Sequence, residues 1–315
     1  MTWAAVVLAL VGRVVFSFVD PSITESSGLV DLGSVMVTMN DSGGDPDVFV
    51  VDPRTGRTVG RTTYADRVTD VEALAPGGGD IVWVGDIGDN DEHRDSVQVY
   101  RVPVTRGDHR VEAPSYDLVY PDGPHDAESL VAAPDGRLYV ITKGLLGGTA
   151  YVAPKRLDPA GPNRLQPVAS VDIWATDAAL FPDGRHLLVR GYDSAVVYSF
   201  PDFQPLASLD LPRQRQGEGV SIGSSGRIRL SSEGRNSAVL EVKLPAEVQT
   251  IIDGGKLTAT LSPGPSPQHG SPARGTTAAP RWLLVAGIAG LVASGVFLAL
   301  LVPRRRSREG PSLDR

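Results

Sequence analysis

The sequence predicts an all-β fold, a β-propeller of five blades, followed by one transmembrane helix near the C-terminus. Three observations support this fold class. A pattern of short strands recurs at spacings of 47, 56, 49 and 41 residues, no sustained helical apolar period occurs before residue 282, and residues 282–302 are mostly apolar and uncharged. A sixth blade is the alternative if the flanking segments form one more.

The repeat has a constant order of features. An acidic residue precedes a short apolar strand, a glycine turn, a second strand, a polar loop and a third strand. The copies begin at Glu25, Glu72, Glu128, Asp177 and Glu218. Periods of about 40–50 residues with several short strands are typical of propeller blades. Fourth strands are expected at 58–64 and 115–120, and residues 13–19 are a candidate for the strand that closes the ring.

Two apolar segments indicate a membrane protein. The stretch 282–302 contains 21 residues, enough to span a bilayer as a helix. Arg304, Arg305 and Arg306 follow it, which by the positive-inside rule places the C-terminus in the cytoplasm. The apolar run 3–11 has the length of a signal-peptide core, although no basic residue precedes it.

These signals divide the chain into five parts and give its topology. The predicted parts are an atypical signal segment (1–19), an extracytoplasmic propeller (20–260), a Pro/Gly/Ser-rich stalk (261–281), the transmembrane helix (282–302) and a basic cytoplasmic tail (303–315). The expected location is the plasma membrane, crossed once, with the N-terminal domain outside. The lipid bilayer is therefore a predicted partner through 282–302.

Composition excludes several functions. The chain has no cysteine, which excludes disulfides, thiolate metal sites and cysteine nucleophiles. A net charge of −7 argues against nucleic acid as a partner. No phosphate-binding loop or serine-hydrolase motif occurs in a meaningful context. What remains as a partner is an unidentified extracellular ligand or protein.

The repeat also predicts a working face. In a propeller the first strand of each blade lines the central channel, and the loop from the second to the third strand opens on the same face as the loop that enters the first. The residues expected at this channel mouth are Glu25, Asn40, Asp41, Glu72, Asp86, Glu128, Lys143, Asp177, Arg190, Glu218 and Glu233.

Three interpretations of this ring are open. In the first, the carboxylates brace the fold by accepting hydrogen bonds from backbone amides, with Lys143 and Arg190 as ionic partners. In the second, adjacent blades bind Ca²⁺ through hard oxygen ligands, and the densest set is Glu25, Asn40, Glu72 and Asp86. In the third, two carboxylates act as acid and base on a sugar or an ester.

The segment from about residue 22 to residue 245 resembles a family of uncharacterised bacterial membrane-anchored propeller proteins. The matching segments are SSGLV, NDSGG, DVEAL, VGDIGDN, YPDG, DAESL, ITKG, FPDGR, QGEG and SSEG. The last repeat is similar to those of phytase-like and esterase-like propellers, some of which use a central calcium ion. The resemblance implies the propeller topology, whereas activity must be argued from the site.

The sequence thus leads to one functional expectation and one alternative. The expectation is a cell-surface, membrane-tethered propeller that acts as a binding or interaction module, with a central Ca²⁺ as the one cofactor considered. The alternative is a calcium-assisted hydrolase of phosphoesters or lactones, which the mixed acidic and cationic mouth favours. A glycosidase with a pair of carboxylates is the third option.

Overall fold

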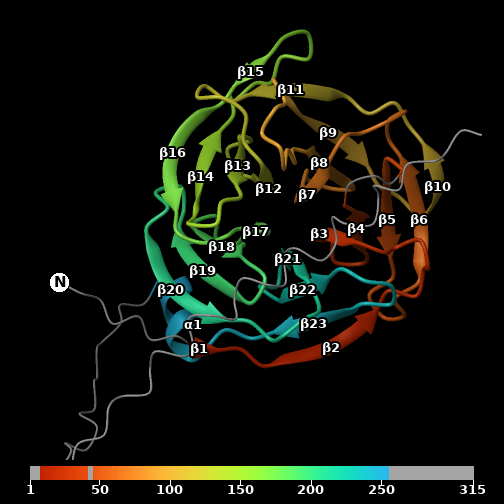
Figure 1. Ribbon diagram of the computed structural model, residues 1–315. Helices are drawn as coiled ribbons and strands as arrows, with labels where there is room; N and C mark the ends of the chain where they lie inside the picture. Colours follow the sequence, from red (N-terminus) through yellow and green to blue (C-terminus); the bar gives the residue numbers. More distant parts are fainter. Residues whose placement is uncertain (1–7, 42–44, 255–315) are drawn as a thin grey trace, which may run out of the picture. The chain divides into compact units, whose positions relative to one another are not determined.

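The structure is a computed structural model of the chain, and it describes residues 8–41 and 45–254. Over these residues the chain forms five β-sheets arranged around a central axis (Figure 1). Each sheet is one blade, so the fold is a five-bladed β-propeller. The described residues form no sixth blade.

The blades follow one another along the chain. Blade 1 contains β3 (Ser26–Asp31), β4 (Met36–Asn40), β5 (Asp47–Val51) and β6 (Thr58–Thr63). Blade 2 contains β7 (Val71–Pro76), β8 (Ile81–Asp86), β9 (Val97–Pro103) and β11 (Ser115–Val119). Blade 3 contains β12 (Ala127–Ala132), β13 (Leu138–Thr142), β14 (Gly148–Val152) and β16 (Gln166–Val171). Blade 4 contains β17 (Asp177–Leu180), β18 (His186–Arg190), β19 (Ser194–Ser199) and β20 (Pro205–Asp210). Blade 5 contains β21 (Gly217–Ile222), β22 (Ile228–Ser232), β23 (Ala238–Val242) and β2 (Gly12–Ser17).

Blade 5 combines the two ends of the propeller. Its outermost strand, β2, comes from the N-terminal segment and pairs antiparallel with β23 (Figure 1). The rings of Phe16 and Phe18 pack edge to face with centroids 5.7 Å apart, and both residues are buried. The ring of blades is therefore closed by hydrogen bonds and apolar contacts rather than by a covalent link.

Short strands extend three blades at their outer edges. All three pair in parallel with the outermost strand of a blade: β10 (Gly107–Arg110) with β6, β15 (Asn163–Arg164) with β11, and β1 (Leu8–Ala9) with β20. One short helix, α1 (Ala246–Ile252), follows the last blade. Such additions cover strand edges that would otherwise be open to pairing with another chain.

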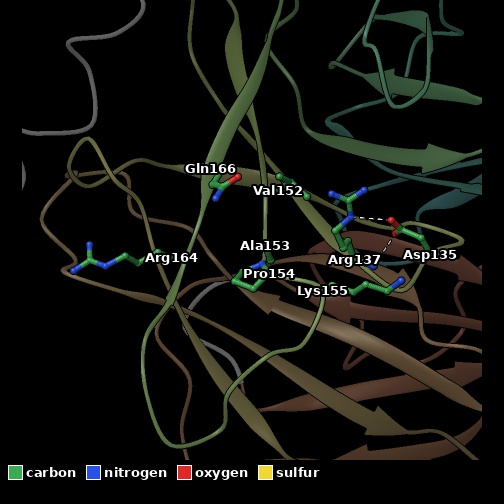
Figure 2. A pocket seen from close by; sticks show the side chains of 8 residues that line it. All are labelled: Asp135, Arg137, Val152, Ala153, Pro154, Lys155, Arg164 and Gln166. Carbon is green, nitrogen blue, oxygen red and sulfur yellow. Dashed lines mark hydrogen bonds and ion pairs between the residues drawn. The ribbon is translucent and has the colours of Figure 1, made fainter.

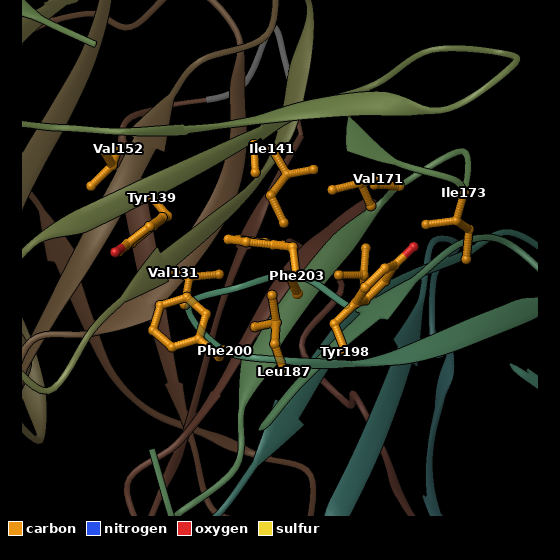
Figure 3. Close-up of a cluster of buried hydrophobic side chains, with 14 of the residues drawn as sticks. Val131, Tyr139, Ile141, Val152, Val171, Ile173, Leu187, Tyr198, Phe200 and Phe203 are labelled. Carbon is orange, nitrogen blue, oxygen red and sulfur yellow. The ribbon is translucent and has the colours of Figure 1, made fainter. Parts of the chain in front are cut away.

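The core lies between neighbouring blades. Strand residues are rich in valine, isoleucine and leucine, which suit a pleated surface that packs on both faces. Figure 3 shows one of these clusters, in which Tyr139 and Ile141 of blade 3 meet Leu187 and Tyr198 of blade 4. Each fully buried side chain of this kind contributes roughly 1.5–3 kcal/mol relative to exposure. Because every interface is filled in this way, the inner strands are held at fixed positions around the axis.

The predicted membrane segments lie outside the residues that the structure describes. The stalk, the transmembrane helix at 282–302 and the basic tail lie outside the described residues, as do residues 1–7 of the predicted signal segment. Within residues 8–41 and 45–254, no helix has the length and apolar character needed to cross a bilayer.

Candidate functional site

The inner strands β3, β7, β12, β17 and β21 are neighbours around the axis, in that order, and β21 returns to β3. Three of them place a glutamate at the same position of the ladder. Glu72, Glu128 and Glu218 each come directly after the first paired residue of the strand, at a shift in register. Such irregularities re-aim a side chain. All three glutamates are buried, with 4–5% of their surface exposed.

Blade 1 departs from this pattern. Its equivalent position holds Ser27, which follows the first pair of β3, Ser26 with Asn40. The Ser27 hydroxyl donates to the backbone oxygen of Glu72 at 3.0 Å and to Glu72 Oε2 at 3.2 Å. Glu25, which the repeat predicted at this point, precedes β3 and is exposed. The carboxylate ring therefore has no buried member from blade 1.

Two of the predicted calcium ligands support the backbone instead. Asn40 Oδ1 accepts hydrogen bonds from the amides of Thr24 and Glu25 at 3.0 and 3.1 Å. Asp86 accepts from the amides of Thr69 and Asp70 at 2.8 and 2.9 Å. Both side chains thus fix the loop that enters the first strand of their blade. Of the predicted set of Glu25, Asn40, Glu72 and Asp86, Glu72 belongs to the group of carboxylates whose oxygens lie within 4.8 Å of one another among the described residues, together with Asp41 and Asp70.

In blade 4 the two residues predicted at the mouth, Asp177 and Arg190, have a structural role. Asp177 is fully buried and accepts from the amides of Ala178 and Val220 at 2.8 and 2.7 Å. Burial raises the pKa of its carboxyl well above the usual value, against the effect of these amides. Arg190 is also fully buried and donates to the carbonyl oxygens of Gly219 and Ser231 at 2.5 and 3.0 Å. These contacts join blade 4 to blade 5.

Lys143 is the cation that faces the mouth. Its ammonium forms an ion pair with Glu128 Oε1. It also lies 5.9 Å from the ring centroid of Trp174 and 5.6 Å from that of Tyr192, within the range of cation–π attraction. Burial lowers the pKa of Lys143, but Glu128 and Tyr192 raise it further, so the net shift is upward. Lys143 therefore stays charged at neutral pH.

A glutamine connects the two carboxylates of blade 5. Gln216 Nε2 donates to Glu218 Oε1 at 3.2 Å and to Glu233 Oε1 at 2.7 Å. Burial is the main cause that raises the pKa of both carboxyls to about 7. Burial likewise raises the pKa of Glu128 to about 8, in spite of Lys143. These groups exchange protons close to neutral pH.

The densest group of ligand atoms lies between blades 1 and 2. Asp41, Asp70 and Glu72 each offer one oxygen, and these oxygens lie within 4.8 Å of one another. Burial, followed by the charges of Asp41, Glu128 and Asp70, raises the pKa of Glu72 to about 11. Without a counter-charge, Glu72 is therefore protonated at neutral pH.

The backbone brings these three residues together. The amide of Asp41 donates to the carbonyl of Glu25 at 2.8 Å, and that of Gly88 donates to the carbonyl of Asp70 at 3.1 Å. Gly88 has no side chain, and a Cβ there would collide with Asp70 Oδ2 and Glu72 Cγ. The loop after β8 can approach the carboxylates this closely only because position 88 is glycine.

Hard oxygen atoms at this spacing fit a calcium ion. Ca²⁺ takes about 6–8 oxygen ligands at about 2.3–2.6 Å, so two ligands of one ion lie at most about 5 Å apart. The separations among Asp41, Asp70 and Glu72 meet this limit. A cation among these oxygens would also offset the charges of Asp41 and Asp70, which help to raise the pKa of Glu72.

Several residues that the sequence predicted at the mouth take part in these contacts. The sequence placed Asp41, Glu72, Glu128, Lys143, Glu218 and Glu233 at the mouth, where the described contacts connect several of them. It did not single out Asp70, Gln216, Trp174 or Tyr192. Asp70 and Gln216 each stand two residues before a repeat glutamate, and this shared offset was the available signal.

The pocket in Figure 2 lies apart from this site and is lined by residues of blade 3 and by Arg164 of β15, the strand that pairs with blade 2. It measures about 380 Å³ and contains three basic side chains. These side chains point in different directions, and Arg137 is bound to Asp135 through an Nε–Oδ2 contact of 2.8 Å (Figure 2). Because the cationic groups do not converge, this pocket is not a candidate anion site.

A scan against models of known protein families finds no match. A search of curated protein sequences also finds no match. Among solved structures, the glutaminyl cyclase of Myxococcus xanthus aligns with a TM-score of 0.49 and 10% identity, over 75% of this chain and 97% of that one. A luciferin-regenerating enzyme aligns with a TM-score of 0.44 and 12% identity, over 75% of this chain and 96% of that one.

A protein described as glucose dehydrogenase aligns with a TM-score of 0.45 and 11% identity, over 75% of this chain and all 100% of that one. Similarity at this level supports no inference about activity. The functional argument therefore rests on the residues at the channel mouth.

Proposed function

We propose that this protein is a membrane-tethered, extracytoplasmic binding module whose channel mouth holds Ca²⁺ through Asp41, Asp70 and Glu72. The observation that carries the proposal is the convergence of their three oxygens within 4.8 Å of one another. A bound cation would favour the ionised form of the buried Glu72 beside the two partly buried aspartates. When bound, it would also give an extracellular ligand a positively charged contact.

The tether and the location of the propeller rest on the sequence. Residues 282–302 have the length and composition of a bilayer-spanning helix, and Arg304–Arg306 follow it. Proteinase K added to intact cells should therefore cleave the stalk at 261–281 and release the propeller. A C-terminal tag should stay protected until the cells are lysed, and protection of the propeller instead would contradict this topology.

Thermal unfolding of the full-length protein, first in EDTA and then in about 2 mM Ca²⁺, tests the calcium site. This concentration is about an order of magnitude above roughly 10⁻⁴ M, a dissociation constant at which extracellular modules bind Ca²⁺. A ligand that binds only the native state raises the midpoint with the logarithm of its concentration. Asp70→Asn should abolish the rise. Glu112→Gln, an exposed carboxylate away from the mouth, should keep it.

A second candidate function is a hydrolase of phosphoesters or lactones. It is favoured by Glu128 and Glu218, whose pKa values of about 8 and 7 suit proton transfer at neutral pH. Bound Ca²⁺ would polarise a phosphoryl or carbonyl oxygen. Lys143 would orient an anionic substrate, and Glu218 would accept a proton from water.

Activity assays separate the two functions. With p-nitrophenyl phosphate and a γ-lactone as substrates, a hydrolase should show calcium-dependent turnover that Glu218→Gln abolishes. Turnover in neither assay, or turnover unaffected by Glu218→Gln, would leave the binding module as the function that the mouth supports.

A further inference from the structure

The side of the mouth formed by blades 3, 4 and 5 has a shortage of hydrogen-bond donors. Glu128 and Glu218 are buried, and each has one oxygen bound to a donor, from Lys143 and Gln216 respectively. Their second oxygens, Glu128 Oε2 and Glu218 Oε2, have no hydrogen-bond partner among the described residues. A buried carboxylate oxygen without a donor is costly and is rarely left so.

These two carboxylates lie on either side of blade 4. They interact electrostatically with each other, and Tyr192 interacts with both. Of the charged side chains of blade 4, Asp177 accepts from the amides of Ala178 and Val220. Arg190 donates to the carbonyl oxygens of Gly219 and Ser231, although its charge also acts on Glu218. The blade also contributes two aromatic rings from its loops. Trp174 and Tyr192 pack edge to face with centroids 5.5 Å apart.

Lys143 is an example of the kind of group that fits beside these carboxylates and rings. Its primary ammonium binds a carboxylate and lies close to both rings, at the end of a four-carbon chain. This ammonium forms its ion pair with Glu128 Oε1 and supplies no hydrogen bond to Glu128 Oε2 or Glu218 Oε2. A second ammonium would bring three more N–H donors and a further positive charge.

Apolar surface is available beside these groups. Trp174 is 41% exposed, although tryptophan is usually buried. Leu145 and Leu146, in the loop directly after Lys143, are 75% and 96% exposed. That loop is close to the segment before Trp174, since a Cβ on Gly147 would meet the carbonyl of Val171. A hydrocarbon chain leaving the site would therefore find apolar surface on this rim.

We propose that the mouth contains a second ligand site, between Glu128 and Glu218 and beside Trp174, which binds a small aliphatic primary amine in its ammonium form. The ammonium donates to the two unpartnered carboxylate oxygens, and the hydrocarbon chain lies against the exposed ring. This site goes beyond the proposed calcium site and uses none of its ligands.

Calorimetric titration of the full-length protein in detergent tests the proposal, with hexylammonium chloride as the probe at constant ionic strength and pH 7. The matched control ligand is 1-hexanol, which keeps the hydrocarbon chain but has no charge. Hexylammonium should bind and 1-hexanol should bind at least about tenfold more weakly, the usual loss when charge-assisted hydrogen bonds are removed.

Variants locate the site. Glu218→Gln should weaken hexylammonium binding by about tenfold, and Trp174→Ala by about two- to fivefold. The exposed-surface control Glu112→Gln should change it by less than about twofold. Trp174 is half-exposed, so its variant tests the proposal even if Glu218→Gln does not fold.

Two results would overturn the amine site: equal binding of hexylammonium and 1-hexanol, or equal effects of Trp174→Ala and Glu112→Gln. Repeating the titration in EDTA separates this proposal from the previous one. Amine binding in a protein that fails to bind Ca²⁺ would reject the calcium site alone. Calcium binding without amine binding would reject the amine site alone.

Discussion

Replacing Glu72 by glutamine should stabilise the metal-free protein. Glu72 is buried, and its pKa is raised from 4.5 to about 11 by burial and by the neighbouring carboxylates. At pH 7 the unfolded chain has released this proton while the folded chain retains it. The cost is about 1.4 kcal/mol for each of the roughly 2.5 pH units between 4.5 and 7, which is between about 3 and 3.5 kcal/mol. Glutamine has a similar shape and needs no proton, so it removes this cost.

The stability difference between Glu72→Gln and the wild type should depend on pH. Because the folded pKa is raised, the native state binds more protons than the unfolded state between pH 4.5 and about pH 11. The stability of the metal-free wild-type protein should fall as the pH rises through this window. The difference between Glu72→Gln and the wild type should therefore be near zero at pH 4.5 and about 3 kcal/mol at pH 7.

Thermal unfolding in EDTA at these two pH values measures the effect. For a domain of this size, about 3 kcal/mol corresponds to roughly 6–12 °C in the midpoint. Glu112→Gln, at an exposed position, is the control and should leave the midpoint unchanged. A Glu72→Gln variant that is no more stable than the wild type at pH 7, or equally stabilised at both pH values, would refute the reasoning.

Three further predictions concern the surrounding structure. Arg190→Met should lower the free energy of unfolding, measured in urea, by about 3–5 kcal/mol. The variant leaves the buried carbonyls of Gly219 and Ser231 without their donor and removes the positive charge near Asp177. A loss below about 1 kcal/mol would argue against this structural role. Gly88→Ala should weaken Ca²⁺ binding by about tenfold in a calorimetric titration, because its Cβ collides with Asp70 Oδ2; unchanged affinity would mean that the loop does not hold the ligands. Phe18→Ala, at a fully buried position beside the closing strand, should cost about 3–5 kcal/mol in the same urea assay, whereas an unchanged transition would show that this contact does not stabilise the ring.

The five-bladed architecture could be predicted because the repeated strand pattern is spread over the whole propeller. The repeat occurs once in every blade, so an error in one copy does not change the number of blades. Glu72, Glu128 and Glu218 were identified because each occupies the same position of a first strand. Residues 13–19 had two interpretations, as part of a signal segment or as a strand, and the structure has a strand over Gly12–Ser17.

The direction of individual side chains could not be predicted in the same way. Asn40 and Asp86 have the right spacing for the mouth, but their side-chain oxygens accept hydrogen bonds from backbone amides of the loop that enters the first strand. Asp177 is one methylene shorter than the glutamates and reaches the amide of Val220. Asp70 stands two residues before Glu72, but this offset does not show that the loop after β8 folds back on Asp70, which is a tertiary contact.

The most direct test of the central claim is equilibrium dialysis of the full-length protein against ⁴⁵Ca²⁺, with the number of bound ions per chain as the result. We expect one ion per wild-type chain, retained by Glu112→Gln and lost when Asp70 and Glu72 are replaced together by asparagine and glutamine. No bound ion in the wild type, or equal binding by the double variant, would show that Asp41, Asp70 and Glu72 do not form a calcium site.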